Sequence, residues 1–149
     1  MKYSPIVEIG AGTGYWAALV KQAGGDIIAF DPHPPRVNYE KNPYHQRTAT
    51  FFPVKRGSYN QAKNRPDRTL FMCWPPYNSS IAYRTLREYT GSTLIFVGEG
   101  EGGCTGNDDF FKLLEYEFNI IEEVDIPQWY GIHDRMMVFE RVNLSPASV

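Results

Sequence analysis

The length, composition and charge of the chain exclude several classes of protein. Its 149 residues suit a single domain, and a hydrophobic fraction of 42% with 15% aromatic residues excludes a disordered chain. A formal net charge of −2 excludes a strongly basic protein, and two cysteines without metal-like spacing exclude a disulfide framework and predict no metal site. A reducing cytoplasm is the compartment that fits best.

The first residues do not have the pattern of a signal sequence. The residues before Ile6 lead straight into an apolar strand-like run and lack the basic and apolar regions of a signal peptide. No apolar run approaches the roughly 18 residues that a membrane-spanning helix needs. We therefore expect a soluble cytoplasmic domain at residues 1–142, followed by a loose tail at 143–149.

Apolar runs alternate with segments of helical period along the chain. Strands are predicted at 6–9, 27–30, 50–55, 69–73, 93–98, 119–126 and 135–142, helices at 14–22, 59–64, 79–89 and 108–117, and an irregular stretch at 31–49. This alternation predicts an α/β domain of three layers, with a mostly parallel seven-stranded sheet between helices. The last two strands are joined by too short a segment for a parallel crossover, so the final strand should run antiparallel.

The first predicted strand opens into a turn with glycine at alternate positions, Gly10, Gly12 and Gly14. Glycine suits such a turn because the backbone visits positive φ and because a ligand can lie against a main chain without Cβ atoms. Asp31 ends the second predicted strand, where a carboxylate is placed to accept hydrogen bonds from both ribose hydroxyls of an adenosine. The two features together predict a nucleotide site.

Two families of nucleotide-binding protein compete for this turn. The dinucleotide fingerprint G-x-G-x-x-G needs glycine where the chain has Tyr15, which disfavours an NAD(P)-dependent oxidoreductase. The spacing Glu8-x-Gly10-x-Gly12-x-Gly14 resembles motif I of the class I S-adenosylmethionine (SAM) dependent methyltransferases. That resemblance implies a Rossmann-like fold and SAM as cofactor, with S-adenosylhomocysteine as product. The residues it implies for cofactor binding are Glu8, Gly10, Gly12, Thr13, Gly14, Asp31, Pro32, Ser58 and Cys73.

The strand at 69–73 ends in Trp74-Pro75-Pro76-Tyr77, which resembles motif IV of the amine-methylating members. The resemblance implies that the Pro75 carbonyl accepts a hydrogen bond from the acceptor amine and that the Tyr77 ring stacks on a planar acceptor. Trp74 stands where the family has a polar acceptor group, and an indole donates a hydrogen bond but accepts none. Trp74 is instead expected against the sulfonium or an acceptor ring. A diproline that only ends a strand is the alternative interpretation.

Glu99 follows the fifth predicted strand in a loop that holds five glycines between residues 98 and 106. Its position at the carboxyl edge of the sheet makes it a candidate general base or amine-orienting acceptor. A solvated acid on a mobile loop is the alternative. His33 and His133 are weaker candidates, because a lone histidine in a loop is more often simply exposed.

Charge is distributed unevenly between the two halves of the chain. Residues 36–68 hold eight Lys or Arg against two acids, whereas residues 98–140 hold eleven acids against two basic residues. The basic half favours phosphate-bearing acceptors, nucleic acid included, although two solvated faces of opposite charge are the alternative.

These features predict a SAM-dependent methyltransferase that acts on a nitrogen or another nucleophile of an unidentified acceptor, either phosphate-bearing or planar and nitrogenous. A SAM-binding subunit without catalysis is the main alternative, because Trp74 departs from motif IV. The aromatic-rich composition makes a homo-oligomer plausible. Nucleic acid as a partner stays open, and no membrane partner is expected.

Overall fold

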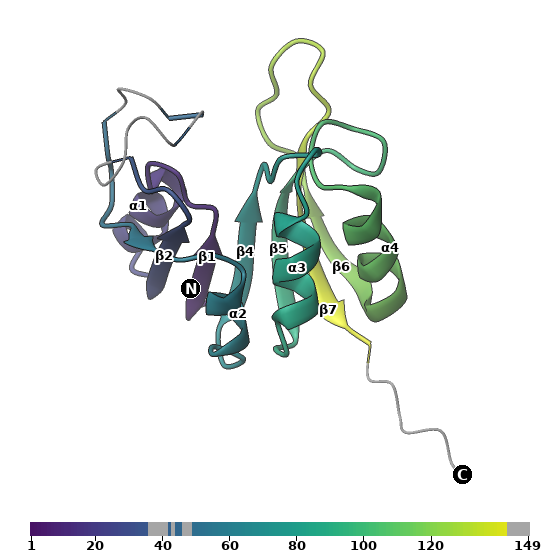
Figure 1. Cartoon of the computed structure of the whole chain (residues 1–149), viewed down its shortest axis with the longest axis horizontal. Helices are drawn as coiled ribbons and strands as arrows, with labels where there is room; N and C mark the ends of the chain where they lie inside the picture. Colours follow the sequence, from purple (N-terminus) through teal and green to yellow (C-terminus); the bar gives the residue numbers. More distant parts are fainter. Residues whose placement is uncertain (36–41, 43, 46–48, 143–149) are drawn as a thin grey trace.

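The protein forms one seven-stranded sheet, described here from a computed structural model that covers residues 1–35, 42, 44–45 and 49–142. The elements are β1 (Ile6–Ile9), α1 (Tyr15–Gln22), β2 (Ile27–Asp31), β3 (Lys55–Arg56), α2 (Asn60–Lys63), β4 (Thr69–Cys73), α3 (Ile81–Glu88), β5 (Thr93–Gly98), α4 (Asp108–Glu117), β6 (Phe118–Val124) and β7 (Arg135–Arg141). The strand order across the sheet is β3-β2-β1-β4-β5-β7-β6. Figure 1 shows this order and labels every strand except β3.

The strand directions match the sequence prediction. β1 pairs in parallel with β2 and β4, and the parallel pairing continues to β3 on one side and β5 on the other. β7 runs antiparallel to both β5 and β6, so the expected reversal of the final strand is confirmed. The pairing of Gly98 with Arg135 places the beginning of β7 beside the end of β5. The β6–β7 connection therefore emerges at the carboxyl edge of β4 and β5.

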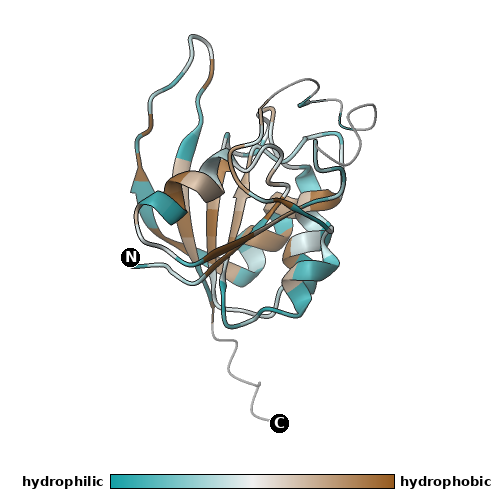
Figure 2. Cartoon of the chain, turned by 90° about the vertical axis from the view of Figure 1, so that its left-hand side faces the viewer, coloured by the Kyte–Doolittle hydropathy of each residue, from teal (hydrophilic) through white to brown (hydrophobic). Residues whose placement is uncertain are grey.

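Helices cover both faces of the sheet, which gives the predicted three layers (Figure 1). On one face, α2, α3 and α4 bury Ala62, Leu86 and Phe110 against β1, β4 and β5. On the other face, α1 buries Ala17 against β1 and β2. Figure 2 shows the consequence as apolar strands between more polar outer surfaces.

Local sequence explains the beginning of α4 and the buried face of α3. Asn107 caps α4 by accepting a hydrogen bond from the Phe110 N–H at 3.3 Å, and Asp108 and Asp109 lie in the first turn, where negative charge is favourable. In α3 the buried positions Ala82, Thr85 and Leu86 form one face, as the helical period predicts.

One predicted strand is wrong. The strand expected at 50–55 reduces to the two residues Lys55 and Arg56, which pair with the end of β2. The residues before them return instead to the glycine turn, where the Phe51 N–H donates to the Thr13 carbonyl at 2.9 Å. Phe52 and Val54 pack into the α1 face of the core. Their alternating apolar pattern thus reflects side-chain packing on the α1 face of the sheet rather than hydrogen-bonded pairing with an edge strand.

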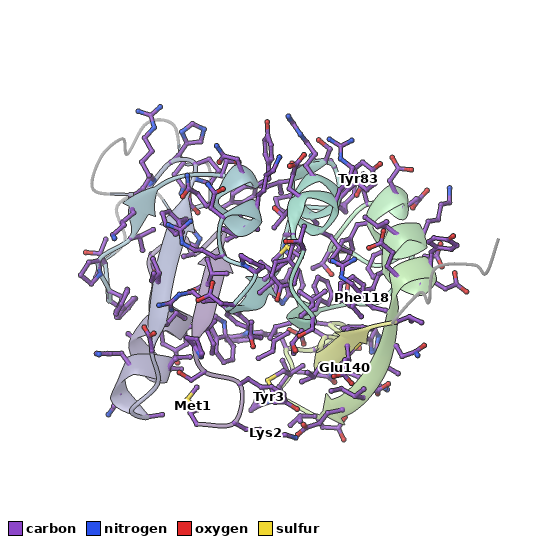
Figure 3. All side chains as sticks on the ribbon, turned by 90° about the horizontal axis from the view of Figure 1, so that it is seen from below. Met1, Lys2, Tyr3, Tyr83, Phe118 and Glu140 are labelled. Carbon is purple, nitrogen blue, oxygen red and sulfur yellow. The ribbon has the colours of Figure 1, made fainter. Side chains whose placement is uncertain are left out.

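The segment that precedes β1 crosses the sheet on the α1 side. Lys2 and Tyr3 both donate hydrogen bonds to the carboxylate of Glu122 on β6, and Tyr3 packs against the core of this face. Seen from below in Figure 3, Met1, Lys2 and Tyr3 lie on the side of the sheet opposite Tyr83 of α3. Across the described residues, no helix is both long and apolar enough to cross a bilayer. The predicted tail at 143–149 and part of the irregular stretch at 31–49 lie outside the described residues.

Candidate cofactor and acceptor site

A cavity of about 1030 Å³ lies at the carboxyl ends of β1, β2 and β4. This edge of an open parallel sheet is where ligands bind in α/β proteins. Most of the residues that the sequence predicts for the site line the cavity: Glu8, Gly10, Thr13, Asp31, Pro32, Cys73, Trp74, Pro75 and Tyr77. Four of the predicted residues do not line the cavity: Ser58, Glu99, Gly12 and Gly14. The described structure thus brings the two predicted motifs to one cavity.

The glycine turn has the backbone that its sequence predicts. Gly10, Gly12 and Gly14 have φ values of 82°, 53° and 75°, in the left-handed region that favours glycine. The N–H groups of Gly10 and Ala11 donate to the Phe30 carbonyl at 2.8 and 2.9 Å, which ties the turn to β2. A Cβ at Gly14 would lie 2.8 Å from the Cβ of Phe52, so the turn is closely packed from behind.

Asp31 joins the end of β2 to this turn. One carboxylate oxygen accepts a hydrogen bond from the Gly12 N–H at 2.9 Å, and the other accepts from the His33 N–H at 2.8 Å. The side chain is buried yet lines the cavity. Because a carboxylate oxygen accepts more than one hydrogen bond, each oxygen keeps capacity for a ligand hydroxyl. The arrangement fits the predicted ribose contact and also gives Asp31 a structural role.

Glu8 forms part of the cavity wall at the end of β1. It is 1% exposed, and its Oε2 atom has no hydrogen-bond partner among the described residues. Burial raises the pKa of Glu8 to about 8, the negative charge of Asp31 adds to the increase, and the backbone of Ala17 opposes it. A buried carboxyl with an unused oxygen, beside a second carboxylate, suits a ligand that brings positive charge.

Part of the cavity wall was not predicted from the sequence. Asn42 is 4% exposed, donates to the His33 carbonyl at 2.8 Å, and accepts from the N–H groups of Tyr44 and His45 at 3.1 Å each. This network places the His45 ring against the glycine turn, where a Cβ at Gly12 would lie 2.3 Å from its Nε2. The segment has no periodic pattern, so the only signal available was an Asn that favours turns.

The loop after β4 forms the side of the cavity that the sequence predicts for the acceptor. Trp74 has a φ of 50°, unusual for a residue with a bulky side chain, and its Nε1–H donates to Asp134 Oδ2 at 2.8 Å. Tyr77 is 60% exposed at the mouth of the cavity. The Pro75 carbonyl already accepts a hydrogen bond from the Gly106 N–H at 2.8 Å. The indole therefore donates, as expected, but to a carboxylate that sequence reasoning did not single out.

Glu99 lies beside the cavity rather than in its wall and joins two loops. Oε2 accepts from the Cys104 N–H at 2.7 Å, and Oε1 accepts from the His133 N–H at 2.9 Å. These two hydrogen bonds hold the pKa of Glu99 below its usual range. A carboxylate with both oxygens engaged by backbone N–H groups is better placed to hold the loops than to remove a proton. Its predicted role as a base stays a prediction.

The cavity wall holds the acids Glu8 and Asp31 and the histidines His33 and His45. No Lys or Arg occurs among the described residues that line it. Of the predicted basic segment, Arg65 stacks on the Phe30 ring, Arg68 pairs with Asp26, and Lys63 pairs with Glu88. Arg36, Lys41 and Arg47 lie outside the described residues. The described Lys and Arg residues of the segment at 36–68 therefore do not line the cavity.

Cys73 and Cys104 both line the cavity as free thiols. Burial, followed by the charge of Glu8, raises the pKa of the Cys73 thiol to about 12, so it stays protonated at neutral pH. Within the described part of the chain, no group of three His, Cys, Asp or Glu side chains could hold a metal ion. The cavity therefore offers polar and apolar contacts to an organic ligand.

Comparison with known proteins identifies the fold. No protein-family model matches the sequence, and no similar sequence occurs among curated proteins. The structure resembles magnesium protoporphyrin IX methyltransferase from Synechocystis PCC 6803 with bound SAM (TM-score 0.54, 11% identity, covering 92% of this chain and 69% of that chain). It also resembles a 1,6-didemethyltoxoflavin-N1-methyltransferase from Burkholderia thailandensis with bound S-adenosylhomocysteine (0.56, 14%, 93% and 71%). The N-methyltransferase NodS from Bradyrhizobium japonicum WM9 is a third example (0.56, 12%, 91% and 76%).

The chain therefore has the Rossmann-like fold of the class I SAM-dependent methyltransferases, as motif I led us to expect. At these low identities the likeness establishes the fold alone. The chain spans about two thirds to three quarters of the length of these proteins.

Proposed function

We propose that the protein binds SAM and transfers its methyl group to a nitrogen of a planar acceptor. The observation that carries the proposal is the single cavity that joins the glycine turn and Asp31 to the Trp74–Tyr77 loop. A cofactor held on the first group of residues and an acceptor held on the second would meet at the carboxyl edge of β1 and β4. The protein would act mainly by positioning the two and by excluding water.

The residues present fit this cofactor. Gly10 lines the cavity and lets a ligand approach the backbone, and Asp31 keeps capacity for ribose hydroxyls. Glu8, with its unpartnered oxygen, faces the same cavity and suits the positively charged part of the ligand. When bound, SAM supplies a methyl group on a sulfonium, which is open to attack by a nucleophile.

The acceptor half fits a planar group better than an aliphatic one. The exposed ring of Tyr77 and the indole of Trp74 both border the cavity, and aromatic faces bind flat ligands well. The described cavity wall carries no Lys or Arg that would bind a phosphate at the reacting end. A phosphate further along the acceptor would have to reach the basic segment outside the cavity.

Calorimetric titration with SAM, S-adenosylhomocysteine and NAD tests the cofactor. We expect both sulfur nucleosides to bind and NAD not to bind, because Tyr15 occupies the third glycine position of the dinucleotide fingerprint. Tight binding of NAD alone would overturn the proposal. Transfer of labelled methyl groups to nucleic acid, protein and small-molecule pools then tests catalysis.

A SAM-binding subunit without catalysis is the second candidate, and Trp74 in place of a polar acceptor favours it. The two candidates differ at Tyr77. In an enzyme, Tyr77→Ala should lower turnover strongly and change SAM affinity by less than about threefold, because the ring faces the acceptor. SAM binding by the parent protein without methyl transfer to any pool would favour the second candidate.

A further inference from the structure

Three buried side-chain oxygen atoms of the described residues lack a hydrogen-bond partner. They are Glu8 Oε2, Thr85 Oγ1 and Asp134 Oδ1, from β1, α3 and the β6–β7 connection. Glu8 and Thr85 line the cavity, and Asp134 is bonded to Trp74, which also lines it. Buried polar atoms without partners are rare in native proteins, and each calls for a physical explanation. Of the three residues, only Glu8 is assigned to the cofactor.

The acceptor groups that the sequence predicts are already engaged elsewhere. The Pro75 carbonyl accepts from Gly106, and both oxygens of Glu99 accept from backbone N–H groups. Asp134 Oδ2 accepts from Trp74, whereas Oδ1 has no partner. The Asp134 side chain thus accepts a single hydrogen bond, although it is only 8% exposed.

Asp134 is held firmly although it follows a loop. Gln128 donates to its carbonyl at 2.6 Å, and the preceding His133 N–H is fixed by Glu99 at 2.9 Å. The side chain then reaches Trp74, 60 residues earlier in the sequence. Its charge also reaches the cavity wall: after burial and Glu8, Asp134 contributes to the raised pKa of Cys73. These contacts place one fixed negative charge behind the indole.

We propose that Asp134 is a positioning and specificity-determining residue of the acceptor pocket. Its hydrogen bond fixes the Trp74 indole, and its carboxylate selects a planar acceptor that carries cationic or N–H groups. The chain would thereby supply from the β6–β7 connection the acidic group that position 74 lacks. This inference rests on the proposed function, since it concerns the acceptor half of the same cavity.

Two isosteric probes test the charge selection without any knowledge of the natural acceptor. Benzamidinium and benzamide are both planar, but only the first is cationic. With the protein saturated by S-adenosylhomocysteine, titration of each probe is followed through the indole N–H signals of the three tryptophans, with Trp74→Phe assigning that of Trp74. Because Asp134 itself does not line the cavity, its charge acts on the probe through the Trp74 indole. We expect benzamidinium to bind about twofold to thirtyfold more tightly than benzamide, the range for a cation against an aromatic face.

Two variants of Asp134 separate its charge from its hydrogen bond. Asp134→Asn should keep the Trp74 indole signal near its parent position, because an amide oxygen still accepts, but should lose the preference for benzamidinium. Asp134→Ala should lose both. Asp125→Asn, a matched change at an exposed residue of the same connection, should leave both unchanged.

The outcomes distinguish this inference from the proposed function. Failure to bind S-adenosylhomocysteine would overturn the proposed function itself. Binding of that nucleoside, with equal binding of the two probes, binding of neither, or a preference that survives Asp134→Asn, would overturn only the role of Asp134.

Discussion

The two halves of the cavity are assembled in different ways. The cofactor half comes from two short stretches at the ends of adjacent strands, residues 8–14 and Asp31, tied by hydrogen bonds between neighbours in the sheet. The acceptor half joins Trp74, Glu99 and Asp134, which lie far apart in the sequence and meet through two loops. A site built from local turns can be predicted from sequence spacing, whereas one built from loop-to-loop contacts cannot.

The largest effect should come from the buried acid of the cofactor half. Because the pKa of Glu8 is raised from 4.5 to about 8, the folded state binds a proton that the unfolded state releases between these values. Stability should therefore fall as pH rises through this window, by about 3 to 5 kcal/mol in total. Glu8→Gln should remove this part of the dependence of stability on pH.

Urea unfolding from pH 4.5 to 8.5 measures the difference between parent and variant. Glu140→Gln removes one exposed carboxylate and serves as the matched control, with the slope of the parent. If Glu8→Gln kept the full slope of the parent, Glu8 would not be the proton-binding group.

The glycine turn should be the next most sensitive point. Gly14→Ala puts a Cβ at a φ of 75°, 2.8 Å from the Phe52 Cβ and 3.0 Å from Val54. Strain and clash together should cost about 2 to 4 kcal/mol of stability and weaken SAM binding. Gly24→Ala is the control, because its φ is 83° but a Cβ there would meet nothing within 4 Å. Equal losses in the two variants would show that close packing at Gly14 contributes nothing.

Asp31→Ala should affect the cofactor more than the fold. Loss of hydrogen bonds to a charged acceptor should weaken SAM binding about tenfold to a hundredfold in calorimetry. Asp67→Ala, at an exposed acid in the turn before β4, should bind SAM as the parent does. Unchanged affinity in Asp31→Ala would remove the ribose assignment and leave Asp31 only its bonds to Gly12 and His33.

The smallest effect belongs to the acceptor half. The N–H groups of Cys104 and His133 lower the pKa of Glu99. The contribution of Glu99 to the stability of the fold is therefore present above the unfolded pKa of 4.5 and is lost as pH falls through the lower pKa of the folded state. The amide signals of Cys104 and His133 should shift together below pH 4.5. Glu99→Gln offers one oxygen for two N–H groups, and one of these amides should exchange faster at neutral pH. Independent titration of the two amides would contradict a shared partner.

Sequence reasoning succeeded where structure is local. The glycine spacing predicted the turn, and the short connection after 126 predicted the reversed β7. It failed at 50–55, because Phe52 and Val54 alternate like strand residues but pack behind Gly14. It also missed Asn42 and Asp134, since the partners that make them important are brought together by the fold rather than by periodicity.

The reversal of β7 has a consequence for how such a protein can diversify. Because β7 begins beside the end of β5, the connection from Asp125 to Asp134 leaves and re-enters the sheet at the edge that carries the cavity. Replacement of this connection by a segment of different length or composition should leave every strand pairing in place. Grafting of other segments between Val124 and Arg135 should therefore change the acceptor preference while the residues proposed for the cofactor stay the same.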